Sequence, residues 1–281
     1  MRTSRILYIW LISFFLWGFS IVKHDSNSRL EIPTVASDES LTIHTGYTTS
    51  YNHKFHIPNW VAYELHPSEL NGINERSDKF LPDPLIKPST CNSADYTKTG
   101  YDRGHMAPAG DMTWSETAMK ESFFMSNICP QSPPLNRGIW KDLESAVRNY
   151  VKNQQHPLFI VTGPVISEND PVYNHWQLGI IGKTHRVTVP KYFFKAVLDT
   201  VGIDKSVAYI IPNSLPKVTF QEYKSNYGGH SRFRITVDSL ESVLNRNLFP
   251  KISTKLGSNE NQNAKLDPKN KVESKVGLII E

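Results

Sequence analysis

The chain has 281 residues and a mass of 32.0 kDa, which suffices for one domain of roughly 200 residues with additional segments. Its composition, 39% hydrophobic and 21% charged, is ordinary for a globular protein. A formal net charge of +4 is compatible with phosphate-bearing partners but is too small to identify them. The two cysteines, Cys91 and Cys129, exclude a disulfide framework and a cysteine metal signature, and two separate thiols are favoured over one bridge.

The N-terminal segment, residues 1–25, predicts export or anchoring. Arg2 and Arg5 precede an almost unbroken apolar run over residues 6–22. This run is at the short end of the length that spans a membrane as a helix, and it is slightly longer than the apolar part of a usual signal peptide. No Ala-x-Ala-like cleavage site follows, so a cleaved signal peptide and an uncleaved membrane anchor both stay open. Because the arginines favour a cytoplasmic N-terminus, either alternative predicts a periplasmic, secreted or membrane-anchored protein whose main domain lies outside the cytoplasm.

Composition divides the rest of the chain into three parts. Residues 26–48 are polar and lack periodicity, which predicts a linker. Residues 253–281 are rich in Lys, Asn, Ser, Glu and Gln, and we expect a disordered tail there. The folded domain is therefore expected over residues 49–252.

Short strands dominate the expected secondary structure of this domain. Apolar and polar residues alternate over 60–65 and 186–189, and short apolar runs near turn residues cover 158–161, 193–198 and 207–211. Many short strands with few helices favour an α+β fold over a regular parallel alternation.

Two segments predict helices. In the first, apolar residues recur every four positions, which is the pattern of an amphipathic helix; they are Leu135, Ile139, Leu143, Val147 and Val151. In the second, Asp238 and Glu241 resemble a capping box that begins a helix before Leu244.

The residues with the most chemistry lie between positions 101 and 144. Hydrolysis of a phosphodiester needs an activated water, positive charge on the phosphate and help for the leaving alkoxide. His105 offers a base with an ordinary pKa near neutrality, which predicts that activity falls on the acidic side near neutral pH. Arg103 offers the planar donors that grip phosphate. An amide or carboxylate oxygen can bind a hard cation such as Mg²⁺.

Spacing along the first helix narrows the choice of metal ligand. Asn136, Trp140 and Glu144 occur at i, i+4 and i+8. Asn136 is expected near the helix start, where free N–H groups favour anions such as phosphate. Glu144 would lie about 12 Å further along a regular helix, so one ion is not expected to bind both directly. Glu144 is better placed to act through water. Asn136 alone is also explained as a helix cap, and Trp140 as core packing.

Two blocks carry a family resemblance. The sequence YDRGHMAPA over residues 101–109 resembles the signature of the DNA/RNA non-specific endonuclease family, which includes endonuclease G. The sequence FMSNICPQ over residues 124–131, followed by Asn136, Trp140 and Glu144, resembles that family's second block at the same spacing. Weaker similarities run from about residue 45 to 252, and they include WVAYE over 60–64, Arg76, Asp95, Tyr96, VTGP over 161–164 and IPN over 211–213.

The resemblance implies a ββα-metal nuclease fold: a central, largely antiparallel sheet flanked by helices, with the site on a strand–strand–helix unit. It implies that His105 is the general base and that Asn136 is the one direct protein ligand of Mg²⁺, for which Mn²⁺ can substitute. It implies phosphate contacts for Arg76, a water-orienting role for Glu144 and 5′-phosphate products. Asn127 is expected near the substrate, holding the site in shape.

Several alternatives stay open beside this reading. Arg103 has two equally favoured roles, an internal structural contact and a phosphate contact. Asp102 is expected to be structural and to orient a neighbouring side chain. The rival functions are a binding protein without activity, an anchored scaffold, and a phosphodiesterase for small or lipid substrates. DNA and RNA are the expected partners, with the membrane as a further one through residues 6–22. The oligomeric state stays open, and a homodimer is one alternative.

Overall fold

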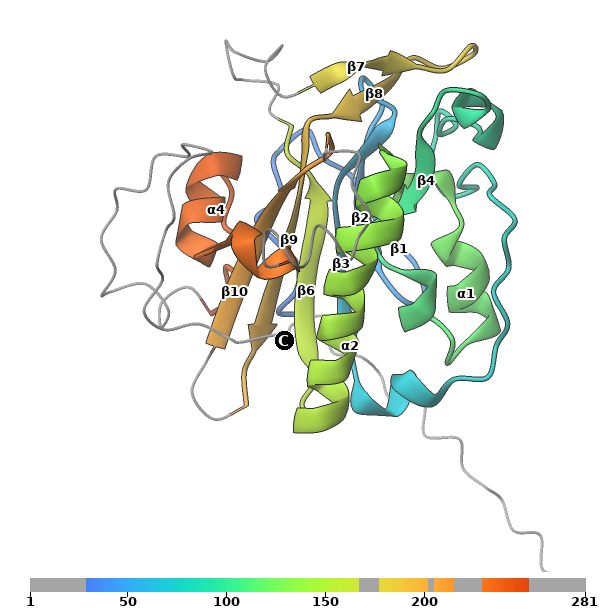
Figure 1. The fold of residues 1–281 in the computed structure, drawn as a ribbon. Helices are drawn as coiled ribbons and strands as arrows, with labels where there is room; N and C mark the ends of the chain where they lie inside the picture. Colours follow the sequence, from blue (N-terminus) through green and yellow to red (C-terminus); the bar gives the residue numbers. More distant parts are fainter. Residues whose placement is uncertain (1–28, 167–176, 202–204, 215–228, 253–281) are drawn as a thin grey trace, which may run out of the picture.

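The computed structural model describes residues 29–166, 177–201, 205–214 and 229–252. Among these residues, seven strands form one sheet in the order β1-β2-β3-β6-β9-β10-β11, and every neighbouring pair is antiparallel. The strands are β1 (Leu41–Ile43), β2 (Thr48–Asn52), β3 (Ile57–Leu65), β6 (Leu158–Pro164), β9 (Tyr192–Asp199), β10 (Lys205–Pro212) and β11 (Arg234–Ile235). The expected α+β fold with a central antiparallel sheet is therefore confirmed (Figure 1).

Among the described elements, two smaller ribbons and three α-helices lie outside this sheet, together with several short 3-10 turns. The ribbons pair β4 (Asp102–His105) with β5 (Ile128–Gln131), and β7 (Gln177–Ile181) with β8 (Val187–Pro190). The α-helices are α1 (Glu116–Ser122), α2 (Lys141–Gln154) and α4 (Val237–Leu244). Each of the five strands expected from the sequence lies within or overlaps an observed strand, because their apolar runs are buried on one or both faces of a sheet.

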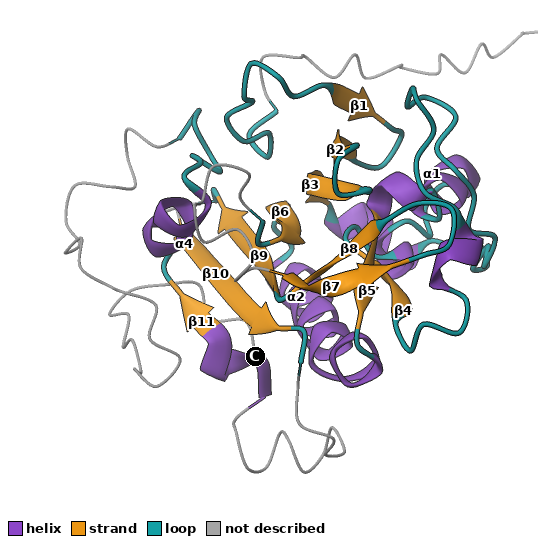
Figure 2. Cartoon of the chain, turned by 90° about the horizontal axis from the view of Figure 1, so that it is seen from above, coloured by secondary structure: helices purple, strands orange, loops and turns teal. Residues whose placement is uncertain are grey.

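Strict alternation of side chains separates two cores across the large sheet. On β9, Phe193 and Val197 join one core, while Phe194 and Leu198 join the other. Helix α2 covers the first core and α4 covers the second, and Figure 2 shows these two helices on opposite sides of the sheet. The β4–β5 ribbon packs against the same core as α2.

The two predicted helices are confirmed, with differences at their starts. The first begins as a π-helical turn, η5 (Leu135–Trp140), which continues into α2. Within that turn Gly138 has φ −109° and ψ −107°, outside the helical region. In α4 the N-cap is Thr236, whose hydroxyl accepts a hydrogen bond from the backbone N–H of Ser239. The capping box expected at Asp238 and Glu241 is therefore wrong, since a threonine two residues earlier already caps the helix.

Part of the expected linker belongs to the folded body. Strand β1 pairs with β2 at the sheet edge, the backbone N–H of Thr34 donates to the carbonyl of Asn247, and Arg246 forms an ion pair with Glu39 at 2.7 Å. The prediction of a linker over 26–48 is therefore wrong for residues 34–48, which hydrogen-bond to the sheet edge and to the segment around Asn247. The expected signal or anchor over 1–25 and the tail over 253–281 lie outside the described residues. No helix in the described part of the chain is long and apolar enough to cross a membrane.

Both cysteines are buried and unpaired. Burial raises the pKa of the Cys91 thiol to about 12. The expectation of two separate thiols agrees with this arrangement, and both thiols act as packing groups.

Candidate active site

A strand–strand–helix unit forms the frame of the site. Strands β4 and β5 are antiparallel, with His105 opposite Ile128 and Asp102 opposite Gln131. The η5 turn and α2 then follow β5 in the chain. Gly104 permits close packing here, since a Cβ atom at this position would lie 2.1 Å from the side-chain oxygen of the buried Gln131. The two sequence blocks, residues 101–109 and 124–131, therefore meet in the β4–β5 ribbon, beside the helix that follows β5.

His105 is held rigidly at the end of β4. Its imidazole packs edge-on against Phe123, with ring centroids 4.8 Å apart, and lies 5.5 Å from Phe80. Its backbone carbonyl accepts a hydrogen bond of 3.3 Å from the indole nitrogen of Trp140. The Nε2 atom is buried and has no hydrogen-bond partner among the described residues. Burial and then the charge of Arg76 lower the pKa of His105 to about 3, so the imidazole is neutral at physiological pH.

The two candidate arginines are placed differently. The guanidinium of Arg76 lies 4.9 Å from the centroid of the Phe123 ring and donates to Asp78, and about half of its side chain is exposed. Its charge acts on His105, so the half-exposed guanidinium lies close to the imidazole. Arg103 is anchored instead: its guanidinium lies between the rings of Phe80 and Tyr96. It also donates to the carbonyl of Ser93.

Asn136 presents an oxygen rather than a free N–H group. Its side-chain nitrogen donates to Asp102 at 3.0 Å, and Arg137 binds the same carboxylate. Asp102 therefore orients a neighbour, as expected, and the amide oxygen of Asn136 is left to accept a ligand. The backbone N–H of Asn136 donates to Ser132 at 2.9 Å. The free backbone N–H expected there is wrong, because two helical residues, Pro133 and Pro134, precede η5 and the Ser132 carbonyl accepts this N–H.

Asn127 holds the loop that follows His105. It is fully buried, accepts from the backbone N–H of Ala107 at 2.9 Å, and donates to the carbonyls of Ala107 and Ser122 at 2.8 Å each. Since both atoms of the amide are engaged inside the protein, the expectation of a direct substrate contact does not fit, and the shape-holding role does.

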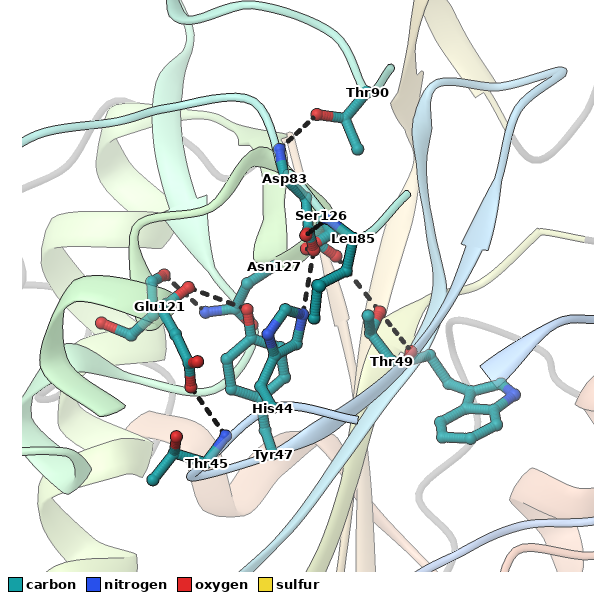
Figure 3. A network of polar contacts seen from close by, with 12 residues as sticks. His44, Thr45, Tyr47, Thr49, Asp83, Leu85, Thr90, Glu121, Ser126 and Asn127 are labelled. Carbon is teal, nitrogen blue, oxygen red and sulfur yellow. Dashed lines mark hydrogen bonds and ion pairs between the residues drawn. The ribbon is translucent and has the colours of Figure 1, made fainter. Parts of the chain in front are cut away.

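A buried polar network fixes the segment that carries Ser126 and Asn127 (Figure 3). The carboxylate of Asp83 accepts hydrogen bonds from the imidazole of His44 at 2.9 Å and from the hydroxyl of Ser126, the residue before Asn127. Burial would raise the pKa of the Asp83 carboxyl, but the hydrogen bonds from His44 and Ser126 outweigh it, and the pKa lies below its ordinary value. This network ties the loop around Asp83 and the β1–β2 turn to the site.

Glu144 belongs to a cluster of charges beside the site, in which Asp111 and Lys195 are buried and Glu144 and Arg148 are half-buried. Burial raises the pKa of Glu144 to about 7, against the charges of Lys195, Arg148 and Arg76. Asp111 also raises it, while Asp111 itself binds Arg148 at 2.7 Å and the hydroxyl of Tyr63 at 3.0 Å. Arg76 thus acts on both Glu144 and His105, which brings the three predicted residues into one electrostatic environment.

Sequence reasoning missed most members of that cluster, namely Tyr63, Asp111, Arg148 and Lys195. One signal was present: Lys195 is the only charged residue inside the apolar run expected to form a strand over 193–198. The other members come from distant segments, so no local pattern connects them.

The donor set suits a cation that keeps most of its water. Among the described residues, no three His, Cys, Asp or Glu side chains lie close enough to hold a metal ion. The available ligand is the amide oxygen of Asn136, which its bond to Asp102 orients. A single hard oxygen ligand fits Mg²⁺, which dehydrates reluctantly and binds through few protein groups.

Comparisons with known proteins agree with this geometry. Residues 26–255 match the family described as DNA/RNA non-specific endonuclease. The mitochondrial nuclease of Saccharomyces cerevisiae is 30% identical over 253 residues, covering 85% of this chain and 70% of that protein. Mitochondrial endonuclease G of Homo sapiens is 31% identical, covering 75% and 70%. A Nostoc nuclease is 32% identical, covering 79% and 78%.

A solved structure supports the fold as well. A chain of the crystal structure of the EndoG/EndoGI complex superposes with a TM-score of 0.63 at 26% identity, covering 75% of this chain and 86% of that one. The expected ββα-metal fold is thereby confirmed.

Proposed function

Because this chain belongs to the DNA/RNA non-specific endonuclease family, whose members are metal-dependent nucleases, we propose that it is an exported, Mg²⁺-dependent enzyme that cleaves DNA and RNA without strong sequence preference. The observation that supports this best is the convergence of His105, Arg76 and Glu144 beside the strand–strand–helix unit. A neutral base, a half-exposed guanidinium and a carboxylate together supply what phosphodiester hydrolysis requires.

In the proposed mechanism His105 takes a proton from the attacking water. Its buried, neutral imidazole is available for this at physiological pH, and the bond from Trp140 to its backbone fixes its position. A bound polyanion would add negative charge near His105 and so raise its pKa, which strengthens the base when substrate is present. Arg76 contacts the phosphate with the donors that Asp78 leaves available.

Asn136 would hold the metal through its amide oxygen, with Asp102 fixing the orientation of the amide. When bound, Mg²⁺ supplies positive charge that stabilises the leaving 3′-oxygen, and Mn²⁺ can replace it. Glu144 orients water in the site. Cleavage at this bond leaves 5′-phosphate ends. The role of Arg103 is chiefly to brace Phe80 and Tyr96, and any phosphate contact uses the donors not bound to Ser93.

Export is proposed from the apolar run over residues 6–22 and the arginines before it. The relatives include proteins described as mitochondrial, so a mitochondrial location is the alternative outcome of a localisation experiment. Fractionation of cells that produce the full chain, beside a variant lacking residues 6–22, distinguishes the two. Activity that stays in the cytoplasmic fraction for both forms would contradict export.

The test of activity follows conversion of supercoiled plasmid and of a long RNA by the purified protein. We expect cleavage of both polymers with Mg²⁺, none with excess EDTA, and a loss of at least about 100-fold in His105→Ala. The exposed Lys205→Met serves as the control variant. Equal cleavage by wild type and His105→Ala would show that His105 is not the base, and full activity in EDTA would remove the metal from the mechanism.

A further inference from the structure

Lys195 occupies a position where the fold calls for an apolar side chain. It lies on β9 between Phe193 and Val197, which both belong to the core beneath α2. By strand alternation its side chain points to that same core. It is fully buried, and its strand is paired on both sides, with Thr162 of β6 and Tyr209 of β10 opposite it. Nothing in the sheet requires a charge at this position.

The Lys195 ammonium contacts residues that adjoin the candidate active site. Its Nζ atom lies 5.0 Å from the ring centroid of Trp140 and 5.9 Å from that of Tyr63. It has no hydrogen-bond partner among the described residues. Burial lowers the pKa of Lys195 below its ordinary value; the charges of Glu144 and Asp111 oppose this shift, and the charge of Arg148 adds to it. Trp140 and Glu144 are four residues apart, and neighbouring turns of a helix place such residues side by side.

Burial of an ammonium group without hydrogen bonds is unfavourable, and an apolar residue of similar size is usually at least as stable at such a position. A feature that costs stability and faces a site is commonly kept for function. We propose that Lys195 is a positioning residue of the nuclease, whose buried ammonium group packs on the Trp140 indole and, through its charge, favours the ionised Glu144 carboxylate one helical turn away. The proposal rests on the proposed role of Glu144.

Two contacts would transmit this effect to the reacting atoms. Trp140 donates to the backbone carbonyl of His105, so an ammonium over the indole steadies the strand end that carries the base. The charge of Lys195 also opposes protonation of Glu144, on which Asp111 acts in the opposite direction and Arg148 and Arg76 in the same one. Lys195 touches neither substrate nor metal in this arrangement.

The experiment compares Lys195→Met, Glu144→Gln and the double variant, with the exposed Lys205→Met as a matched control. Plasmid cleavage at saturating Mg²⁺ is measured from pH 5 to 9, together with the midpoint of urea unfolding. We expect Lys195→Met to unfold at the same or a higher urea concentration, yet to cleave about 10- to 100-fold more slowly at pH 7. Its rate should recover partly at alkaline pH, because Glu144 then ionises without Lys195. In the Glu144→Gln background the same change should cause a clearly smaller loss, because only the contact through Trp140 then remains.

Three results would overturn the proposal. These are an unchanged rate and pH profile in Lys195→Met, a loss of equal size in the Glu144→Gln background, or a failure of both Lys195→Met and Lys195→Gln to fold, which would show that the lysine serves the fold. Full activity of Glu144→Gln is a different failure. It would remove the proposed role of Glu144 itself, whatever Lys195→Met shows.

Discussion

The order of the pKa values of His105 and Glu144 in the structure is the reverse of the order of their ordinary values. The sequence alone predicts a loss of activity near neutral pH from protonation of the histidine. In the structure burial and Arg76 lower the pKa of His105 to about 3, whereas burial raises the pKa of Glu144 to about 7. Because the proposed mechanism needs a neutral histidine and an ionised glutamate, the histidine is competent over nearly the whole range and the glutamate limits the acidic side.

We therefore expect the cleavage rate to fall below about pH 7 in the wild type, following Glu144. Glu144→Gln should be slower by about 10- to 100-fold and should lose this acidic limb, since no carboxyl remains to titrate. The measurement is a pH–rate profile under single-turnover conditions, with Glu116→Gln, an exposed glutamate of α1, as the control. An acidic limb that persists unchanged in Glu144→Gln would assign it to another group.

At the scale of elements, the loop that carries Asn127 is fixed from two sides. The segment after β4 hydrogen-bonds to it through Ala107, and the buried network of His44 and Asp83 hydrogen-bonds to it through Ser126. The position of His105 therefore depends on segments about 20 to 60 residues away in the sequence.

Removal of the carboxylate at the centre of this network tests that dependence. Asp83→Ala leaves the buried donors of His44, Ser126 and the backbone of Leu85 without their acceptor. We expect a loss of about 2–4 kcal/mol in the free energy of unfolding, measured by urea denaturation. Asp38→Ala, at an exposed aspartate, should change it by less than about 0.5 kcal/mol. A neutral effect of Asp83→Ala would show that the network is dispensable.

At the scale of the whole molecule, the net charge of +4 is small. We therefore expect a few local contacts, rather than the overall charge, to bind the substrate. We expect kcat/KM for plasmid DNA to fall linearly with salt on logarithmic axes, with a slope set by the number of phosphates neutralised. Arg76→Ala should make the slope shallower by about 0.9, the value for one phosphate contact. Arg232→Ala serves as the control among exposed arginines. An unchanged slope in Arg76→Ala would show that this side chain does not bind phosphate.

Local patterns determined much of this protein. The α+β class, the main strands and both helices follow from periodicity, since burial on one face requires it. The two sequence blocks made His105, Asn136 and Glu144 candidate site residues, and a looser match added Arg76.

Only the tertiary structure decided the environment of these residues. Burial next to Arg76 lowers the pKa of His105, and burial raises that of Glu144 within a cluster assembled from β3, β9, α2 and the turn at Asp111. Asn127 proved to be an internal brace, Asn136 an oxygen donor fixed by Asp102, and Lys195 a buried charge beneath the site. Electrostatic energies depend on distance and burial in space rather than on separation along the chain, so residue types can be read from the sequence while their protonation and contacts cannot.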